Sequence, residues 1–236
     1  MQLLKWIWHN ALFLVTLFLL AFIPLYPKIP LIDIENTWVY IRLEDIIVVF
    51  VFLIWGTFFL FKKVTLKTPL TFPIMLFWII GGLSTFHGVL LIFPTIANVF
   101  PNVAFFSFLR RIEYLSLFFI AFAAMKDKRH IYYVIATLVV VLLLVVGYGI
   151  GQKVFGFPAY LTMNEEFAKG IPIQLSQLSR VPSTFAGHYD LAAYLVLIIP
   201  ILISLMFGFK NFILKIFLLI TASLGFALLF MTVTRV

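Results

Sequence analysis

The sequence of 236 residues contains no cysteine and few charged side chains. Without cysteine, the chain can form no disulfide bond, no thiolate metal site and no cysteine nucleophile. Aspartate, glutamate, lysine and arginine together make up 11% of the residues, whereas soluble globular domains carry about 25%. Because a water-exposed surface needs many more polar and charged groups, this composition excludes a soluble enzyme, a disordered segment and a coiled coil.

Hydrophobic residues are abundant instead: they make up 64% of the chain and occur in long runs. The mean hydropathy of +1.16 is typical of a chain whose solvent is a lipid bilayer. A run of about 20 apolar residues crosses the hydrocarbon core as a helix, and the alternating pattern of a membrane barrel is absent. We therefore predict an all-α polytopic membrane protein, a single transmembrane domain over 1–236. Its seven helices are expected at 8–26, 45–61, 70–92, 105–125, 131–151, 190–209 and 213–233.

The net charge of +8 is distributed over the connections between these helices. With the N-terminus in the cytoplasm, the inner segments hold nine of the 17 basic residues and one acid, Asp127. Short connections rich in lysine and arginine are typical of the cytoplasmic side of a membrane protein. We therefore predict a cytoplasmic N-terminus, and we interpret the positive charge as a determinant of orientation and not as a surface for nucleic acid.

The longest connection on the predicted outer side is 152–189. In a chain with otherwise short loops, a loop of this length is more often functional than a spacer. The glycine-rich run Gly147–Gly151 precedes it, inside a predicted helix and without the strand–turn–helix context of a dinucleotide site. These glycines predict close helix packing. Pro200 predicts a kink in the sixth helix.

Charged side chains at the membrane boundary are costly and usually have a function. The predicted topology brings four arginines to the outer side: Arg110, Arg111, Arg180 and Arg235. A guanidinium group is planar and always charged, so several of them suit a pyrophosphate. We therefore predict an anion-binding site at the depth where the pyrophosphate of a lipid would lie. The plainer alternative is that each arginine flanks a helix and extends toward the interface.

His188 and Asp190 lie at the start of the predicted sixth helix, on the same side of the membrane as these arginines. His188 is a candidate general base or phosphate contact, whereas Asp190 is explained by its favourable interaction with the helix dipole. The four histidines are scattered without the spacing of metal ligands, so we predict no metal site. The adjacent Glu165 and Glu166 are expected to be solvated and not to form a catalytic carboxylate pair.

Three segments resemble the O-antigen ligase and polymerase family of membrane glycosyltransferases. They are 108–115 (FLRRIEYL), 180–188 (RVPSTFAGH) with the following 191–195 (LAAYL), and 231–235 (MTVTR), where the family has a Ser-Arg or Thr-Arg pair at the end of a helix. The similarity covers most of the chain in topology but only these segments in sequence. It departs at Tyr189 and Asp190, where the family usually has Pro-Asn.

The resemblance implies a multi-pass enzyme of the bacterial cytoplasmic membrane, acting on its outer face without a metal or other cofactor. Such enzymes transfer a glycan from undecaprenyl pyrophosphate to lipid A core or to a growing polysaccharide. Arg180 and Arg235 match arginines that bind the donor pyrophosphate in the family. Family members continue beyond the Thr-Arg pair into further helices and a large outer loop with a histidine proposed as the base. We therefore expect this chain to be the N-terminal portion, inactive by itself, with its catalytic residues unassigned.

Two other functions use the same features. A transporter or flippase for an anionic lipid or solute would bind its ligand through the same arginines, although charges at mid-membrane and paired broken helices would be expected of it. A membrane scaffold would need no ligand. Substitution of Arg180 and Arg235 distinguishes these classes, because a scaffold should tolerate both changes.

Overall fold

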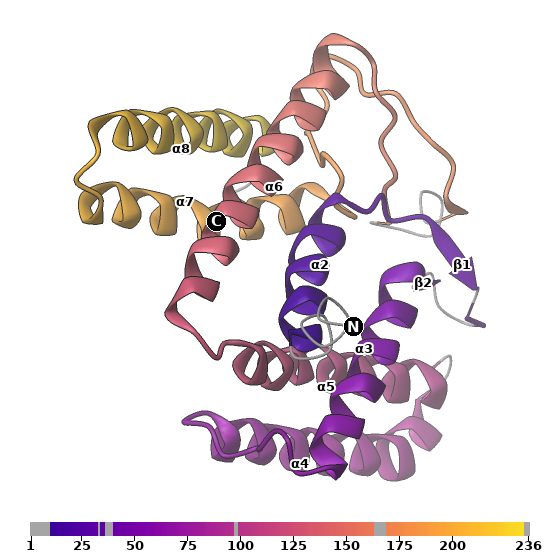
Figure 1. Ribbon diagram of the computed structural model, residues 1–236. Helices are drawn as coiled ribbons and strands as arrows, with labels where there is room; N and C mark the ends of the chain where they lie inside the picture. The colour runs from indigo at the N-terminus through magenta and orange to yellow at the C-terminus, as the bar shows by residue number, and fades with distance from the viewer. Residues whose placement is uncertain (1–9, 33, 36–39, 97–98, 163–168, 234–236) are drawn as a thin grey trace. The chain divides into compact units, whose positions relative to one another are not determined.

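The computed structural model describes residues 10–32, 34–35, 40–96, 99–162 and 169–233. Within these ranges the chain is mainly helical, with one short strand hairpin (Figure 1). The fold is therefore the helical one predicted from the hydropathy pattern. The α-helices are α2 (Ala11–Leu25), α3 (Leu43–Leu60), α4 (Thr71–His87), α5 (Pro101–Ala124), α6 (Lys128–Val154), α7 (His188–Gly208) and α8 (Phe212–Thr232).

Five of the described helices are long and apolar enough to cross a membrane, namely α3, α4 with its extension to Thr95, α6, α7 and α8. The described part of α2 has only 15 residues. Every 18-residue stretch of α5 contains Arg110, Arg111 and Glu113, which lowers its apolar character. Each predicted segment thus coincides with a helix, while the number of spans and their orientation stay predictions.

The chain forms two compact units. Their boundaries fall inside α2, α3 and α6, so that each of these helices supplies residues to both units. The first unit comprises Met1–Thr16, Glu35–Thr37 and Asp45–His130, and the second comprises Leu17–Ile34, Trp38–Glu44 and Ile131–Val236.

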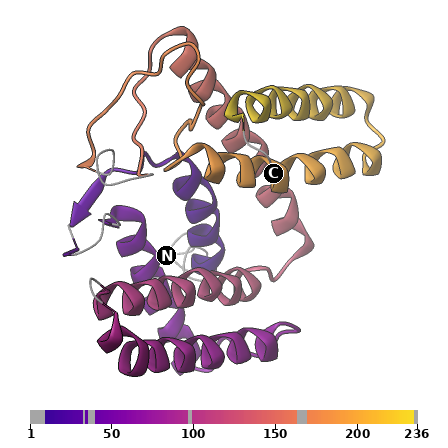
Figure 2. The ribbon, with the colours of Figure 1, turned by 180° about the vertical axis from the view of Figure 1, so that it is seen from behind.

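In the first unit, α4 and α5 lie side by side (Figures 1 and 2), and aromatic rings of α3, α4 and α5 contact one another. The ring of Phe119 in α5 lies 6.4 Å from that of Trp55 in α3 and 6.0 Å from that of Trp78 in α4. Gly81 and Gly82 let α4 approach α5 closely, because an added Cβ at either would lie 3.2 Å from the Phe108 ring. A π-helix (Gly88–Ile92) and a 3-10 turn (Phe93–Thr95) extend α4.

The core of the second unit is made by α6, α7 and α8, with α7 and α8 side by side in both views (Figures 1 and 2). Leu142, Leu195 and Leu202 are completely buried there. The turn into α8 is fixed by Asn211, whose side-chain oxygen accepts bonds from the first backbone amides of the helix. Pro200 lies inside α7, and the helix continues through it.

A two-stranded antiparallel hairpin precedes α3, in a region where the hydropathy pattern predicted only a connection. Its strands are β1 (Pro30–Ile32) and β2 (Ile41–Arg42). The hairpin belongs to the second unit and sets the position of Arg42 directly before the first turn of α3.

Candidate anion-binding site

The connection from α6 to α7 ends in a segment, 181–188, whose residues are buried apart from a half-buried alanine. A buried segment of irregular backbone needs hydrogen-bond partners within the protein, because water cannot reach it. The amide of Val181 donates to the carbonyl of Met231 at the end of α8, at 3.2 Å. The hydroxyl of Ser183 donates to the carbonyl of Val145 in α6, at 2.7 Å. These bonds fix the segment against the helix bundle.

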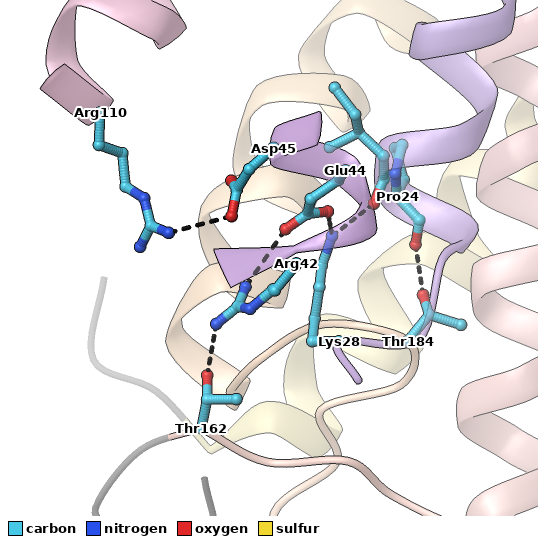
Figure 3. Close-up of polar contacts among 9 residues, drawn as sticks. Pro24, Lys28, Arg42, Glu44, Asp45, Arg110, Thr162 and Thr184 are labelled. Atoms are coloured by element: carbon cyan, nitrogen blue, oxygen red, sulfur yellow. Dashed lines mark hydrogen bonds and ion pairs between the residues drawn. The ribbon is translucent and has the colours of Figure 1, made fainter. Parts of the chain in front are cut away.

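Two prolines at the end of α2 provide further acceptors. Pro27 has no N–H, so the carbonyl of Ile23 cannot form its usual helical bond. Lys28 Nζ donates to that carbonyl instead, at 2.7 Å. Helix α2 ends one residue after Pro24, and the carbonyl of Pro24 accepts the hydroxyl of Thr184, 160 positions later (Figure 3). The buried segment is therefore attached to α2 as well as to α6 and α8.

Gly149 and Gly151 in α6 allow close contacts, and the predicted helix packing is confirmed at Gly149, whereas an added Cβ at Gly147 would meet nothing within 4 Å. A Cβ at Gly149 would lie 2.6 Å from Leu228 Cδ1 and 3.3 Å from Val181 Cγ1. A Cβ at Gly151 would lie 2.4 Å from the ring of Phe157, which folds back over the end of the helix. Both side-chain positions are thus occupied by neighbouring groups.

Consecutive residues at the end of α6 hold the loop on both sides of Arg180. The buried Gln152 donates through Nε2 to the carbonyl of Ser183, at 2.9 Å. Lys153 Nζ donates to three backbone carbonyls of the turn at 176–179. Because the bonds lie before and after Arg180 in the sequence, they limit where its backbone can move.

The side chain of Arg180 reaches the buried ring of His188. The distance from Arg180 Nη1 to His188 Nε2 is 2.8 Å. A guanidinium group can only donate, so Nε2 accepts and the imidazole is neutral, with its proton on Nδ1. Arg180 itself is exposed, and a guanidinium has several N–H groups, so one bond to His188 leaves donors for a ligand. The pair can therefore bind an anion at a fixed position.

A buried ion cluster lies in the same unit. Lys28 pairs with one carboxylate oxygen of Glu44, and Arg42 Nη1 lies 3.2 Å from the other (Figure 3). The exposed fractions of the three side chains are only 6%, 13% and 13%. Arg42 also donates to Thr162 Oγ1 at 2.9 Å, which connects the hairpin to the α6–α7 loop. Charges this deeply buried are tolerated because they are paired.

The charges of this cluster act on two further groups, Asp190 and Tyr26. The charges of Arg42, Lys28 and Glu44 interact with the carboxylate of Asp190 in the first turn of α7. Burial raises the pKa of the Tyr26 phenol, and the negative charge of Glu44 raises it further. The Tyr26 hydroxyl therefore stays neutral at physiological pH.

Of the predicted site residues, the structure brings together Arg180 and His188. Arg110 and Arg111 belong to the first unit. Arg110 Nη2 lies 3.2 Å from the carboxylate of Asp45 (Figure 3), and Arg111 is exposed. Arg235 lies outside the described residues, as does the Glu165–Glu166 pair. The grouping of four arginines stays a prediction.

Sequence reasoning assigned no role to Lys28, Arg42, Glu44, Gln152 or Lys153. A signal existed for the first of them, because closely spaced prolines at a helix end leave carbonyls that a following lysine can bond. The others are recognised only through contacts that are distant in sequence. Among the residues that the structure describes, no group of three histidine, aspartate or glutamate side chains could hold a metal ion.

No protein-family model, curated protein or solved structure matches the chain. The chemistry of the Arg180–His188 pair and the resemblance of the three sequence segments are the two indications of function. Both concern the same residues, since Arg180 and His188 are the first and last residues of one of those segments.

Proposed function

We propose that this chain binds the pyrophosphate of a lipid-linked glycan at Arg180 and supplies the donor site of a membrane glycosyltransferase. The observation that carries the proposal is the bond from the exposed Arg180 to the buried His188, on a loop anchored to three apolar helices. A fixed, charged donor next to an apolar helix bundle suits a ligand with an anionic head and an apolar tail.

The chemistry of glycan transfer agrees with this assignment. An acceptor hydroxyl attacks the anomeric carbon of the sugar and gives up its proton to a general base, and the bond from that carbon to the phosphate oxygen breaks. The electron pair stays with the lipid pyrophosphate, which gains negative charge as it leaves. A guanidinium already in position stabilises that charge without reorganisation. Arg180 would therefore contribute to donor binding and to departure of the leaving group.

The finer assignment follows the sequence resemblance. The donor would be undecaprenyl pyrophosphate carrying a glycan, and the acceptor lipid A core or a growing polysaccharide. The reaction would take place on the outer face of a bacterial cytoplasmic membrane, in an enzyme of the O-antigen ligase and polymerase type.

Substitution of Arg180 in the chain reconstituted in nanodiscs tests donor binding. With undecaprenyl pyrophosphate as the probe, R180Q should weaken binding about 10- to 150-fold, because a hydrogen bond to a charged group contributes roughly 1.5–3 kcal/mol. K169Q removes one positive charge from the same loop and is the matched control, with an expected change below about twofold. Equal affinities of R180Q and the unsubstituted chain would contradict the proposal.

A second measurement separates transfer from transport. Membranes of the native host, with a labelled donor, should convert the glycan into an acceptor-linked product of higher mass, and R180Q should abolish that product. Movement of an unchanged donor across the membrane, without any such product, would support the transporter alternative instead.

A further inference from the structure

The end of α6 marks a boundary of the bilayer. The helix runs from Lys128 to Val154, and its uncharged stretch between His130 and Lys153 is 131–152. At 1.5 Å per residue this stretch is roughly 30 Å long, which matches the thickness of the hydrocarbon core. Lys153 follows directly, so its ammonium group lies at the level of the lipid head groups.

The turn at 176–179 lies at the same level, because Lys153 bonds it directly. Lys153 Nζ donates to the carbonyl of Gln177 at 2.7 Å and to that of Ser176 at 3.1 Å. The turn is closed by the amide of Ser179, which donates to the carbonyl of Ser176 at 3.1 Å. The hydroxyls of these two serines are also 2.7 Å apart. The carbonyls of Ser176 and Gln177 and both serine hydroxyls are thus bonded within the protein.

The one apolar residue of this turn faces outward. Leu178 has an exposed fraction of 97%. A single exposed leucine is ordinary on a protein surface, but this one lies at the depth of the bilayer interface. Phe155, the first residue after α6, is also exposed, at 73%. Exposed apolar residues therefore lie both at the end of the membrane-spanning helix and on the turn that Lys153 of that helix bonds.

We propose that the turn at 176–179 inserts Leu178 into the boundary between head groups and acyl chains, next to the end of α6. The occupant of this surface is the bilayer itself, since Lys153 at the end of a helix long and apolar enough to span a membrane bonds the turn directly. Arg180 follows two residues later, and its positive charge complements lipid phosphate at that depth. The anchor holds Arg180 at the level of phosphate groups, whether or not Arg180 binds a glycan donor.

The absence of cysteine makes a direct test possible, because a single introduced cysteine carries the only label. L178C is labelled with an environment-sensitive fluorophore and reconstituted in phosphatidylcholine–phosphatidylglycerol vesicles. Q177C, at the adjacent exposed position of the same turn, is the matched control. Nitroxide-bearing lipids should quench the label at 178 at least twofold more than the label at 177, and aqueous iodide should quench it less. Equal iodide quenching at both positions, without lipid quenching, would overturn the proposal.

Substitution of Lys153 tests why the turn lies at this depth. K153M in the L178C background removes the bonds to the turn but keeps the apolar stem, and should reduce lipid quenching to the value at 177. K153R should retain it, because a guanidinium can still donate to the carbonyls. Unchanged lipid quenching in K153M would contradict the anchoring by Lys153. Neither measurement uses a glycan donor, so both are independent of the proposed function.

Discussion

The two units hold their helices together in different ways. In the second unit, charged and polar side chains such as Lys28, Gln152 and Thr184 are buried and bonded. In the first, aromatic rings around Phe119 make the described core. The most apolar 18 residues of α4 and its extension to Thr95 have no buried member, whereas 39% of the corresponding stretch of α6 is buried.

This difference shows where a membrane protein needs polar contacts. Lipid tails are as apolar as leucine, so apolar helices gain little from leaving the lipid, and van der Waals packing of aromatic rings makes the described core of the first unit. The loop of the second unit has irregular backbone, which requires hydrogen bonds from the helices around it. Polar contacts are concentrated where a loop must hold a fixed geometry.

The largest expected difference in stability between the units comes from substituting two adjacent carboxylates, Glu44 in the second unit and Asp45 in the first. E44Q removes the carboxylate that pairs with both Lys28 and Arg42, two buried cations, and should lower the free energy of unfolding by about 3–5 kcal/mol. D45N breaks the ion pair to Arg110, whose side chain is 26% exposed and can be hydrated when its partner is lost. Its expected effect is about 1 kcal/mol. Unfolding in mixed detergent micelles measures both, and equal effects would remove the distinction between the units.

Added volume in α6 should have the next largest effect. Valine at Gly149 would collide with Leu228 and Val181, whereas an added Cβ at Gly147 meets nothing within 4 Å. Both variants replace a helical glycine by valine, so the change in helix propensity is the same in each. The difference between their free energies of unfolding therefore reports packing alone. G149V should be less stable than G147V by about 1–3 kcal/mol in the same unfolding measurement. An added Cβ at Gly56 in the first unit also meets nothing within 4 Å. A loss of stability in G56V as large as that in G149V would contradict the assignment of the effect to packing.

The smallest expected effect separates long-range from local hydrogen bonds. T184V removes the bond to Pro24 and leaves that carbonyl without the hydroxyl, which should cost about 1–2 kcal/mol. In the first unit, the Thr85 hydroxyl bonds the Gly81 carbonyl within α4, at 2.8 Å. T85V should change stability by less than about 0.5 kcal/mol, because the helix satisfies that carbonyl by itself. Thermal unfolding measures both losses of stability. A larger loss in T85V than in T184V would show that the attachment of the loop to α2 is unimportant.

Hydropathy predicted the helices because bilayer thickness imposes a length on apolar segments. The helix predicted at 131–151 extends from Lys128 to Val154 in the structure, and the helix predicted at 190–209 begins at His188. These differences occur where polar residues continue the helix beyond the apolar run. Hydropathy carries no signal for such residues.

The candidate site could be predicted only in part. Arg180 and His188 were identified from charge and motif, and they lie together. The residues that position them were not identified, because their contacts join distant parts of the chain and leave no local pattern. Hairpin β1–β2 was missed for a related reason: its strands are too short to show a periodicity.

The bond between Thr184 and Pro24 also has a consequence for biosynthesis. Its partners are 160 residues apart, and a ribosome adds about 5–20 residues per second. The Thr184 hydroxyl that bonds the Pro24 carbonyl is therefore synthesised about 8–30 seconds after Pro24 itself. During this interval α2 is already synthesised, but its end cannot yet have its final partner. Nascent chains arrested before and after residue 184 should differ in the protease sensitivity of the segment that follows α2.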